Sequence, residues 1–560
     1  MARIGEILIQ RGLIDGEQLA KAVEESRRSG EILGRVLVRM GFIEQSQLLS
    51  VLAEQMGLVC YATLKDFDIT PDVIRSVPAK FVWHYRCMPL KLEGKTLTVA
   101  VSDPLAVWVA EDLKLHLGFD VQRVLAPEEE ILSYIRRHYG VGAETVEEIL
   151  ATSGASELTR QERASISIDD FSASDQDASV TKLVNQLLVE AVSARATDIH
   201  LETFRERVSI RYRIDGILYD MQVPEQIRHL YQVVISRIKI LSNLNVVEKR
   251  LPQDGRAIIK VEDKPFDLRI SVIPSINGEN IVIRILPMHL LFNLDDLGFD
   301  PADLKVLQGL LERPHGIIFL TGPTGSGKTT TLYACLSRLN KQAVKIITIE
   351  DPVEYELGGI MQIQVKPDIG LTFANCLRSI LRHDPDIMMV GEVRDLETAE
   401  LSIRTSLTGH LIFSTLHTND AASGAARLLD IGIEPYLVAS SVNAFISQRL
   451  VRVICPACKE PLKNTEFLPE VFKGIPAYHG AGCEKCQFIG YRGRTAIYEI
   501  LPIGDEMREL IIRKASAAEM RRQAKVLGFK TLMDAGLEKV RAGITTPQEI
   551  LRLTELGVEG

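Results

Sequence analysis

Apolar positions near the N-terminus follow one pattern twice. Residues 4–23 (IGEILIQRGLIDGEQLAKAV) align with residues 33–52 (LGRVLVRMGFIEQSQLLSVL) at a single offset, which brings Gly5 onto Gly34. Each copy predicts a short helix, a glycine-marked turn and a second amphipathic helix. Because two such copies can bury their apolar faces against each other, we expect residues 1–58 to form a helical two-repeat module.

The next segment has apolar periodicity, and the one after it does not. Residues 59–140 predict a small α/β domain, with a strand at 97–104 and helices at 105–117 and 128–138. Residues 141–178 are acidic and rich in serine, and they lack the apolar periodicity that a core requires. We therefore expect a flexible acidic linker there.

An α+β pattern covers residues 179–288. The alternating segment VSIRYRI ends at Asp215-Gly216, a dipeptide that favours the tight turn of a β-hairpin. Helices are expected at 180–195 and 225–242, and further strands at 257–261, 266–272 and 281–286. From residue 289 to 560, helices alternate with short apolar strands such as GIIFLTG and KIITIE, which is typical of a parallel α/β sheet.

Charge and hydropathy restrict where the chain works. The formal net charge is −9, most of it in the acidic linker, so no dominant basic surface for nucleic acid is expected. No apolar run approaches the roughly 20 residues that span a bilayer. Arg3, Glu6 and Arg11 interrupt the N-terminus, which argues against a secretory signal. We expect a cytoplasmic protein that contacts a membrane through partners.

The strongest chemical motif is a P-loop. It reads Gly322, Pro323, Thr324, Gly325, Ser326, Gly327, Lys328, Thr329, Thr330. It follows a predicted strand and opens a predicted helix, which is the context that phosphate binding requires. Lys328 is expected to reach the β- and γ-phosphates of ATP, and Thr329 to bind Mg²⁺. The alternative is a glycine-rich turn that holds no ligand.

Two carboxylate segments also follow apolar runs. The first is TIEDPVEYE, which contains Glu354, and the second is MMVGEVRD, which contains Glu392. Ligands of parallel α/β sheets bind beyond the carboxyl ends of the strands, where both segments fall. A solvated acidic loop is the alternative for either one.

The chain resembles the assembly ATPases of type II secretion and type IV pili. The matching segments are GPTGSGKTTTLY, TIEDPVEYE, VGEVRD, TGHLIFSTLHTND, LRSILRHDPD, EKRLPQDGR, ISQRLVR and the paired C-x-x-C motifs. The resemblance implies a RecA-like motor domain over 289–560, preceded by a PAS-like α+β domain. It also implies a homo-hexamer that works on platform proteins of the inner membrane.

The resemblance assigns roles to further residues. Glu354 would position or deprotonate the attacking water, Glu392 would support Mg²⁺, and His410 and His417 would sense the γ-phosphate. Four arginines match positions used at the nucleotide: Arg269 and Arg284 from the α+β domain, and Arg378 and Arg382 from the motor domain. Without the resemblance, ordinary packing or capping would be expected for the histidines, and surface ion pairs for the arginines.

Two C-x-x-C pairs lie within a predicted insertion at 452–495. Four thiolates from Cys455, Cys458, Cys483 and Cys486 suit tetrahedral Zn²⁺, and a closed set of four ligands is typical of a structural site. Redox-active or metal-free cysteines are the alternative.

The N-terminal repeat resembles a module that binds cyclic-di-GMP. That module has an R-L-G-like start and a terminal Gln in each copy. Here the matching residues are Arg3, Gly5, Gly34 and Gln55, whereas Ser26 and Ile32 depart from the pattern. A purely structural docking bundle therefore remains open beside nucleotide binding.

The sequence favours an ATP hydrolase that powers pseudopilus assembly in type II secretion. The wording of segments such as GLTFANCLRSILRHDPD and DIGIEPYLVASS is similar to the secretion branch. A type IV pilus extension ATPase is the alternative. A nucleic-acid translocase and a cyclic-di-GMP receptor are two further classes, which stimulation by DNA or RNA and titration with the dinucleotide would identify.

Overall fold

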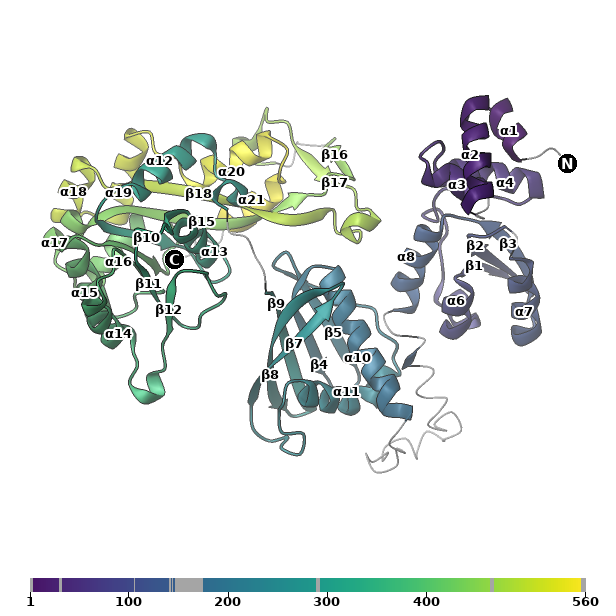
Figure 1. The fold of residues 1–560 in the computed structure, drawn as a ribbon, viewed down its shortest axis with the longest axis horizontal. Coiled ribbons are helices and arrows are strands. Elements are labelled where there is room, and N and C mark those ends of the chain that lie inside the picture. The colour runs from purple at the N-terminus through teal and green to yellow at the C-terminus, as the bar shows by residue number, and fades with distance from the viewer. Residues whose placement is uncertain are drawn as a thin grey trace. The chain divides into compact units, whose positions relative to one another are not determined.

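The structure, a computed structural model, describes residues 4–29, 33–104, 106–140, 143, 145, 146, 175–288, 293–463 and 468–554. The chain divides into two compact units, Met1–Pro287 and Met288–Gly560, each of which has its own cores. Figure 1 shows the elements of both units. Within the described ranges, no helix combines the length and apolar character needed to cross a bilayer.

The N-terminal repeat folds as the sequence predicts. Its four helices are α1 (Ile4–Gln10), α2 (Gly16–Ser29), α3 (Leu33–Arg39) and α4 (Gln45–Met56). Equivalent residues of the two copies share one core, for example Leu8 with Leu37 and Ile14 with Ile43. Both second helices start with the same side-chain and backbone exchange, between Asp15 and Gln18 in α2 and between Glu44 and Gln47 in α4. Such exchanges satisfy the free N–H groups of a first helical turn.

A three-stranded sheet follows. Its elements are α5 (Pro71–Ser76), α6 (Ala79–Tyr85), β1 (Met88–Glu93), β2 (Thr96–Val101), α7 (Val107–Leu117), β3 (Asp120–Leu125) and α8 (Glu128–Tyr139). β1 and β2 are antiparallel, whereas β2 and β3 are parallel and joined through α7. The predicted strand and both predicted helices are confirmed, and β1 and β3 were missed. Most of the predicted linker lies outside the described residues, and its last part, from Asp175, belongs to α10.

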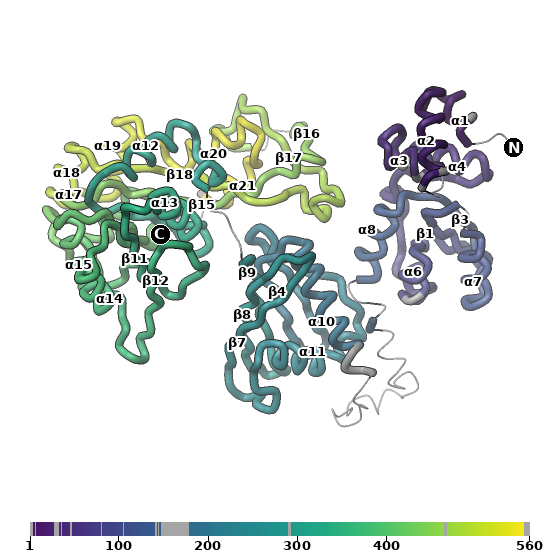
Figure 2. The backbone as a smooth tube through the Cα atoms, in the orientation of Figure 1, coloured from purple at the N-terminus to yellow at the C-terminus, as the bar shows by residue number. Residues whose placement is uncertain are grey.

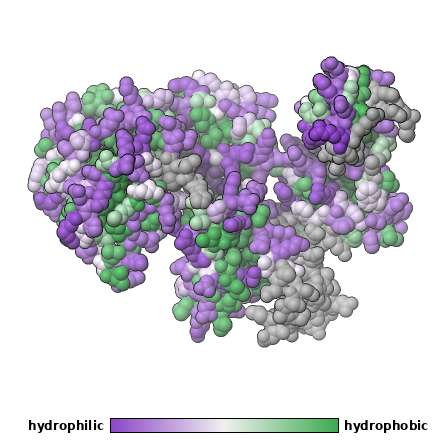
Figure 3. Space-filling view, in the orientation of Figure 1, coloured by the Kyte–Doolittle hydropathy of each residue, from purple (hydrophilic) through white to green (hydrophobic). Residues whose placement is uncertain are grey.

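A six-stranded antiparallel sheet forms the rest of the first unit. Its elements are α10 (Asp175–Ser193), β4 (Ala196–Thr203), β5 (Val208–Ile214), β6 (Ile217–Met221), α11 (Ile227–Leu241), β7 (Gln253–Val261), β8 (Lys264–Ser275) and β9 (Gly278–Pro287). The strand order is β6-β5-β4-β9-β8-β7, with α10 and α11 packed against each other and against the sheet (Figure 2). Asp215 and Gly216 have φ of 49° and 90°, which confirms the hairpin turn. Apolar side chains gather on the surface of the part that holds this sheet (Figure 3).

The second unit is built on a seven-stranded sheet. Its elements are α12 (Pro301–Leu311), β10 (Gly316–Thr321), α13 (Lys328–Leu339), β11 (Ile346–Glu350), β12 (Met361–Gln364), α14 (Phe373–Ile380), β13 (Ile387–Val390), α15 (Leu396–Leu407), β14 (Leu411–Leu416), α16 (Ala422–Ile431), α17 (Pro435–Ser441), β15 (Val442–Ile454), β16 (Lys459–Pro461), β17 (Tyr478–Gly480), β18 (Tyr491–Pro502), α18 (Asp505–Ile512), α19 (Ala517–Val526), α20 (Leu532–Arg541) and α21 (Pro547–Thr554).

The order of this sheet, β12-β11-β13-β14-β10-β15-β18, explains where the candidate residues meet. All strands are parallel except β18. The carboxyl ends of β10, β11, β13 and β14 therefore lie at one edge. The P-loop and the segments that hold Glu354, Glu392 and His417 begin at this edge. The multidomain α/β architecture predicted from the sequence is thus confirmed.

Candidate functional site

The P-loop connects a fully buried strand to a helix whose first residue is Lys328. Its glycines Gly322, Gly325 and Gly327 have φ of 147°, 79° and 88°, a region that side chains disfavour. Pro323, Thr324, Gly325, Thr329 and Thr330 are exposed. The Ser326 hydroxyl is buried and has no hydrogen-bond partner among the described residues. A loop with exposed backbone and an unused buried hydroxyl fits an anionic ligand.

Lys328 lies inside this loop. Its Nζ donates to the carbonyl oxygens of Gly322 at 2.8 Å and Pro323 at 3.1 Å, and the residue is 9% exposed. Burial lowers the pKa of Lys328 to about 8, with a further contribution from the charge of Arg449, while Glu392 acts in the opposite direction. The Lys328 ammonium therefore lies close enough to Arg449 and Glu392 for both charges to act on it.

Arg449 is a site residue that sequence reasoning missed. It lies on β15, next to β10, and its Nη2 donates to the carbonyl of Asn419 at 2.7 Å. A Cβ on Gly322 would lie 3.0 Å from Arg449 Nη1, so the P-loop packs directly on this guanidinium. The segment ISQRLVR was part of the resemblance, but Arg449 within it had no assigned role because strand order is not visible in the sequence.

Glu392 and His417 meet beside the P-loop. They follow the neighbouring strands β13 and β14, and His417 Nε2 lies 3.4 Å from Glu392 Oε2. Arg394 Nε approaches the same carboxylate oxygen at 2.7 Å. The Glu392 side chain is only 13% exposed, whereas His417 and Arg394 are 48% and 72% exposed. The carboxylate is thus positioned by two groups that reach solvent.

Glu354 lies in the loop after β11 and is half-buried. Its backbone N–H donates to the hydroxyl of Tyr333 at 3.4 Å. Tyr333 belongs to α13, the helix that begins with Lys328. The loop that carries Glu354 is therefore attached to the helix that follows the P-loop.

Two predicted arginines of this unit are not joined to the P-loop. Arg378 pairs with Glu397 on α15, and Arg382 Nη1 donates to the carbonyl of Arg378 at 3.1 Å. Among the described residues, no hydrogen bond or ion pair connects either arginine to the phosphate loop. The ion pair of Arg378 matches the alternative of a surface ion pair, whereas Arg382 bonds to a backbone carbonyl.

His410 lies at the other end of the sheet. It precedes β14, whereas the P-loop follows β10, and the two strands run parallel. Six residues of strand, about 20 Å, separate these ends. The His410 ring lies within 3.2 Å of Thr408 Oγ1 and 3.1 Å of the Thr405 carbonyl at the end of α15. The geometry therefore does not support contact of His410 with a γ-phosphate of its own chain.

Arg269 and Arg284 lie in the first unit as direct cross-strand neighbours on β8 and β9. Arg284 Nε donates to Asp198 at 3.1 Å, and Arg269 lies 4.0 Å from Asp267. The Arg284 side chain is 57% exposed and the Arg269 side chain is 30% exposed. The sheet thus presents two adjacent guanidinium groups on one face, since directly opposed residues share a face.

The four predicted zinc ligands come together between β15 and β18. Their sulfur atoms all lie within 4.8 Å of one another, and three of the pairs, Cys455–Cys483, Cys458–Cys486 and Cys483–Cys486, are at 3.8 Å. Tetrahedral zinc with bonds of about 2.3 Å places sulfurs about 3.8 Å apart. A disulfide requires about 2.05 Å. The backbone N–H groups of Cys483 and Gly490 also point at Cys486 Sγ. The cluster fits zinc.

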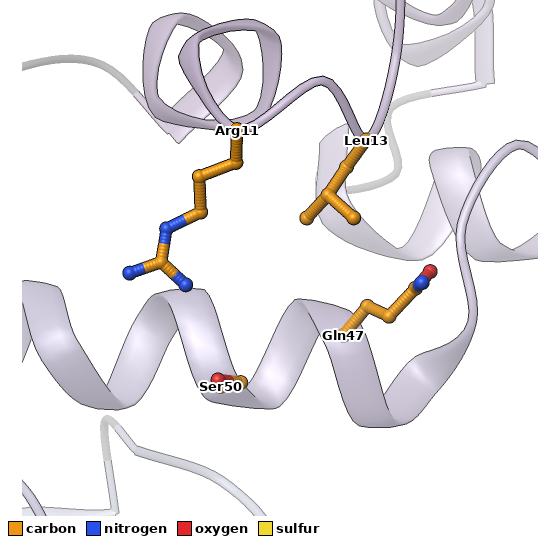
Figure 4. Close-up of a pocket in the computed structure, with 4 residues that line it drawn as sticks. All are labelled: Arg11, Leu13, Gln47 and Ser50. Carbon is orange, nitrogen blue, oxygen red and sulfur yellow. The ribbon is translucent and has the colours of Figure 1, made fainter.

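The helical repeat holds a groove of about 470 Å³ lined by Arg11, Leu13, Gln47 and Ser50 (Figure 4). Arg11 and Leu13 come from the turn of the first copy, and Gln47 and Ser50 from α4. Arg11 also pairs with Glu54.

Three of the four predicted dinucleotide contacts are not among the residues that line this groove. Gly5 and Gly34 face Leu19 and Leu48, and an added Cβ would lie 2.7 Å and 3.1 Å from the nearest leucine carbon, so close helix packing favours glycine at both positions. Gln55 is half-buried, and Arg3 lies outside the described residues.

The chain is similar to known proteins over nearly its whole length. A family model described as type II/IV secretion system protein matches residues 173–552, and a model of the MshEN domain matches residues 58–145. The type IV pilus assembly ATPase PilB of Myxococcus xanthus is 43% identical over 560 residues, 98% of each chain. The type II secretion system protein E of Xanthomonas campestris pv. campestris is 40% identical over 572 residues, 99% of this chain and 98% of that one.

A solved structure shares the fold. The ATPase DotB of Legionella pneumophila superposes with a TM-score of 0.50 at 20% identity, over 67% of this chain and 95% of that one. The MshEN match begins where the helical repeat ends, so it covers the small α/β domain rather than the repeat.

Proposed function

The chain belongs to the type II/IV secretion system protein family, and from this premise we propose that it powers pseudopilus assembly in type II protein secretion. It is an ATP hydrolase. The observation that carries the proposal is that Lys328, Glu392 and His417 lie together at one edge of the sheet. The chain that holds them is 40% identical over nearly its whole length to a type II secretion system protein E.

Different residues bind the phosphates, bind Mg²⁺ and activate the water in the proposed phosphoryl transfer. Lys328 holds the β- and γ-phosphates, and Thr329 and Glu392 hold Mg²⁺, which supplies charge neutralisation when bound. His417 lies on the solvent side of Glu392 and is placed to respond to the γ-phosphate. Glu354 positions or deprotonates the attacking water.

Arginine charge completes the proposed mechanism. Arg269 and Arg284 neutralise charge that develops on the transferred phosphoryl group. Their adjacency and exposure on one sheet face support this role. Arg378 and Arg382 are proposed to act at the nucleotide of a neighbouring subunit of a homo-hexamer. The hexamer is expected to work on inner-membrane platform proteins from the cytoplasmic side.

Pilus extension is the second candidate. The observation that favours it is the 43% identity to a type IV pilus assembly ATPase. Deletion of the gene, with exoprotein secretion and surface pili scored separately, tests both candidates. Complementation by wild type but not by Glu354→Gln is expected to restore secretion. Restoration of pili alone would overturn the secretion assignment in favour of pilus extension.

We also propose that the four-cysteine cluster holds a structural zinc ion. The three sulfur separations of 3.8 Å and the N–H groups directed at Cys486 support it. Zinc would tie β16 and β17 to the long β15–β18 pair. About one zinc per purified chain is expected.

Cyclic-di-GMP binding by the helical repeat is proposed as a regulatory function. The groove offers Arg11 for a phosphate and lies directly before the segment that matches the MshEN domain. Titration of the full chain with the dinucleotide, beside an Arg11→Ala variant, tests it. No heat or fluorescence change in the wild type would leave the repeat as a docking bundle.

A further inference from the structure

A buried carboxylate lies at the end of β11, four residues before Glu354. Glu350 is 3% exposed. Its Oε1 accepts hydrogen bonds from Thr348 Oγ1 at 2.6 Å and Gln362 Nε2 at 3.0 Å, and its Oε2 accepts one from the Tyr333 hydroxyl. No ion pair of the described residues includes Glu350. Its two oxygens are therefore occupied by three donors, which stabilise a buried carboxylate without a cation.

The Tyr333 hydroxyl links three parts of the site. Its ring is fully buried on α13, five residues after Lys328. The hydroxyl donates to Glu350 and accepts the backbone N–H of Glu354. Burial, with the nearby charge of Glu350, raises the pKa of Tyr333, so the hydroxyl keeps its proton and remains a donor.

The loop around Glu354 is held on its other side by β12. The N–H of Val353 donates to Gln364 Oε1 at 3.3 Å. Gln362 donates to the carbonyl of Tyr355 at 3.0 Å and accepts the N–H of Leu357 at 2.7 Å. The backbone of Glu354 itself is held by Tyr333. The Tyr333 hydroxyl thus connects the helix that follows the P-loop to the backbone of Glu354.

We propose that Tyr333 and Glu350 are positioning residues that fix Glu354 relative to the phosphates held by Lys328. The inference rests on the proposed role of Glu354 and deepens it. Glu350 orients the tyrosine hydroxyl, and the hydroxyl fixes the backbone of Glu354. A displacement of about 1 Å at a reacting group can cost about 10²-fold in rate. Substrate binding does not use this contact, so kcat falls while KM for ATP remains.

The test is Tyr333→Phe in the full-length chain, which removes one oxygen and keeps the ring. We expect a kcat lower by about 10- to 100-fold with KM within about twofold of wild type. Glu350→Gln should likewise lower kcat and leave KM for ATP nearly unchanged. The matched control is Tyr498→Phe. Tyr498 is also buried, and its hydroxyl contacts Thr331 on the same helix at 3.4 Å and the Leu297 carbonyl at 3.3 Å. This control should lower the melting temperature and leave kcat unchanged.

A double variant separates positioning from a structural role. In a Glu354→Gln background, residual hydrolysis should not fall further when Tyr333→Phe is added, because the tyrosine acts through Glu354. Full activity of Tyr333→Phe beside an inactive Glu354→Gln would overturn the inference and leave the proposed function intact. Full activity of Glu354→Gln would overturn the proposed function itself. Equal loss of kcat in Tyr333→Phe and Tyr498→Phe would indicate a structural effect and also overturn the inference. If Tyr333→Phe does not fold, Glu350→Gln decides by the same criteria.

Discussion

The low pKa of Lys328 predicts that ATP binding weakens above pH 8. The ordinary lysine pKa of 10.5 is lowered to about 8, mainly by burial and then by the charge of Arg449. The amine is therefore charged below pH 8 and becomes neutral as the pH rises through 8. Bound phosphates favour the ammonium, so ATP selects the protonated form.

The size of the effect follows from the protonated fraction. With a pKa of about 8, about 90% of the free protein is protonated at pH 7 and about 10% at pH 9. Apparent affinity scales with the competent fraction, so the Kd for ATP should rise about ninefold to tenfold, about 1.3–1.4 kcal/mol. The terminal phosphate of ATP has a second pKa of about 6, so it is already ionised over this range. It therefore adds no comparable dependence of the Kd on pH.

Calorimetric titration with Mg-ATP at pH 7, 8 and 9 and constant ionic strength measures this change. The matched control is Lys328→Arg, because a guanidinium stays charged throughout the range. Its affinity should be weaker than wild type at pH 7 and nearly constant up to pH 9. A flat wild-type profile, or an equal decline in Lys328→Arg, would refute the argument from burial.

Three further predictions concern the other sites. Cys455→Ser should remove bound zinc and lower the melting temperature, and metal analysis of the purified chain measures this; unchanged zinc content would contradict the four-ligand site. Arg269→Ala should reduce phosphate release by about 10³-fold with little change in melting, whereas Arg256→Ala, its cross-strand neighbour, should stay near wild type; equal rates in both would remove Arg269 from the mechanism. Gly5→Ala places a Cβ 2.7 Å from Leu19 and should destabilise the repeat by about 1–3 kcal/mol without any ligand, whereas Gly16→Ala meets nothing within 4 Å; similar melting curves for the two would refute the packing argument.

Local patterns predicted the elements that depend on local chemistry. The hairpin at Asp215-Gly216 and the P-loop need particular backbone angles, and their residue types reveal them. The strands β1 and β3 were missed because DVQRVL does not alternate cleanly and MPLKLE, although it alternates, contains a proline, and their pairing with β2 supplies the missing stability. Such strands are fixed by their neighbours rather than by their own sequence.

Strand direction explains the different outcomes for His410 and His417. Both histidines belong to the segment TGHLIFSTLHTND, but His410 precedes β14 and His417 follows it. In a parallel sheet, the carboxyl ends share an edge, so His417 reaches the P-loop edge and His410 does not. No strand was predicted from the sequence between the two histidines, so their roles were not separated. Glu350 was different: its burial depends on Tyr333, from a helix that the sequence does not place beside it.

Close packing in the helical repeat shows that a residue of a binding motif need not contact the ligand. Gly5 and Gly34 belong to the pattern that resembles a dinucleotide module, but their missing side chains leave room for Leu19 and Leu48. The glycines therefore shape the helix pair, and a ligand would follow from that shape rather than from contact with them. The groove beside Arg11 joins the turn of one copy to the second helix of the other, so the duplicated sequence creates a surface that a single copy lacks. A motif residue and a contact residue are thus separable, and Arg11 rather than Gly5 is the position at which ligand binding and folding can be tested apart.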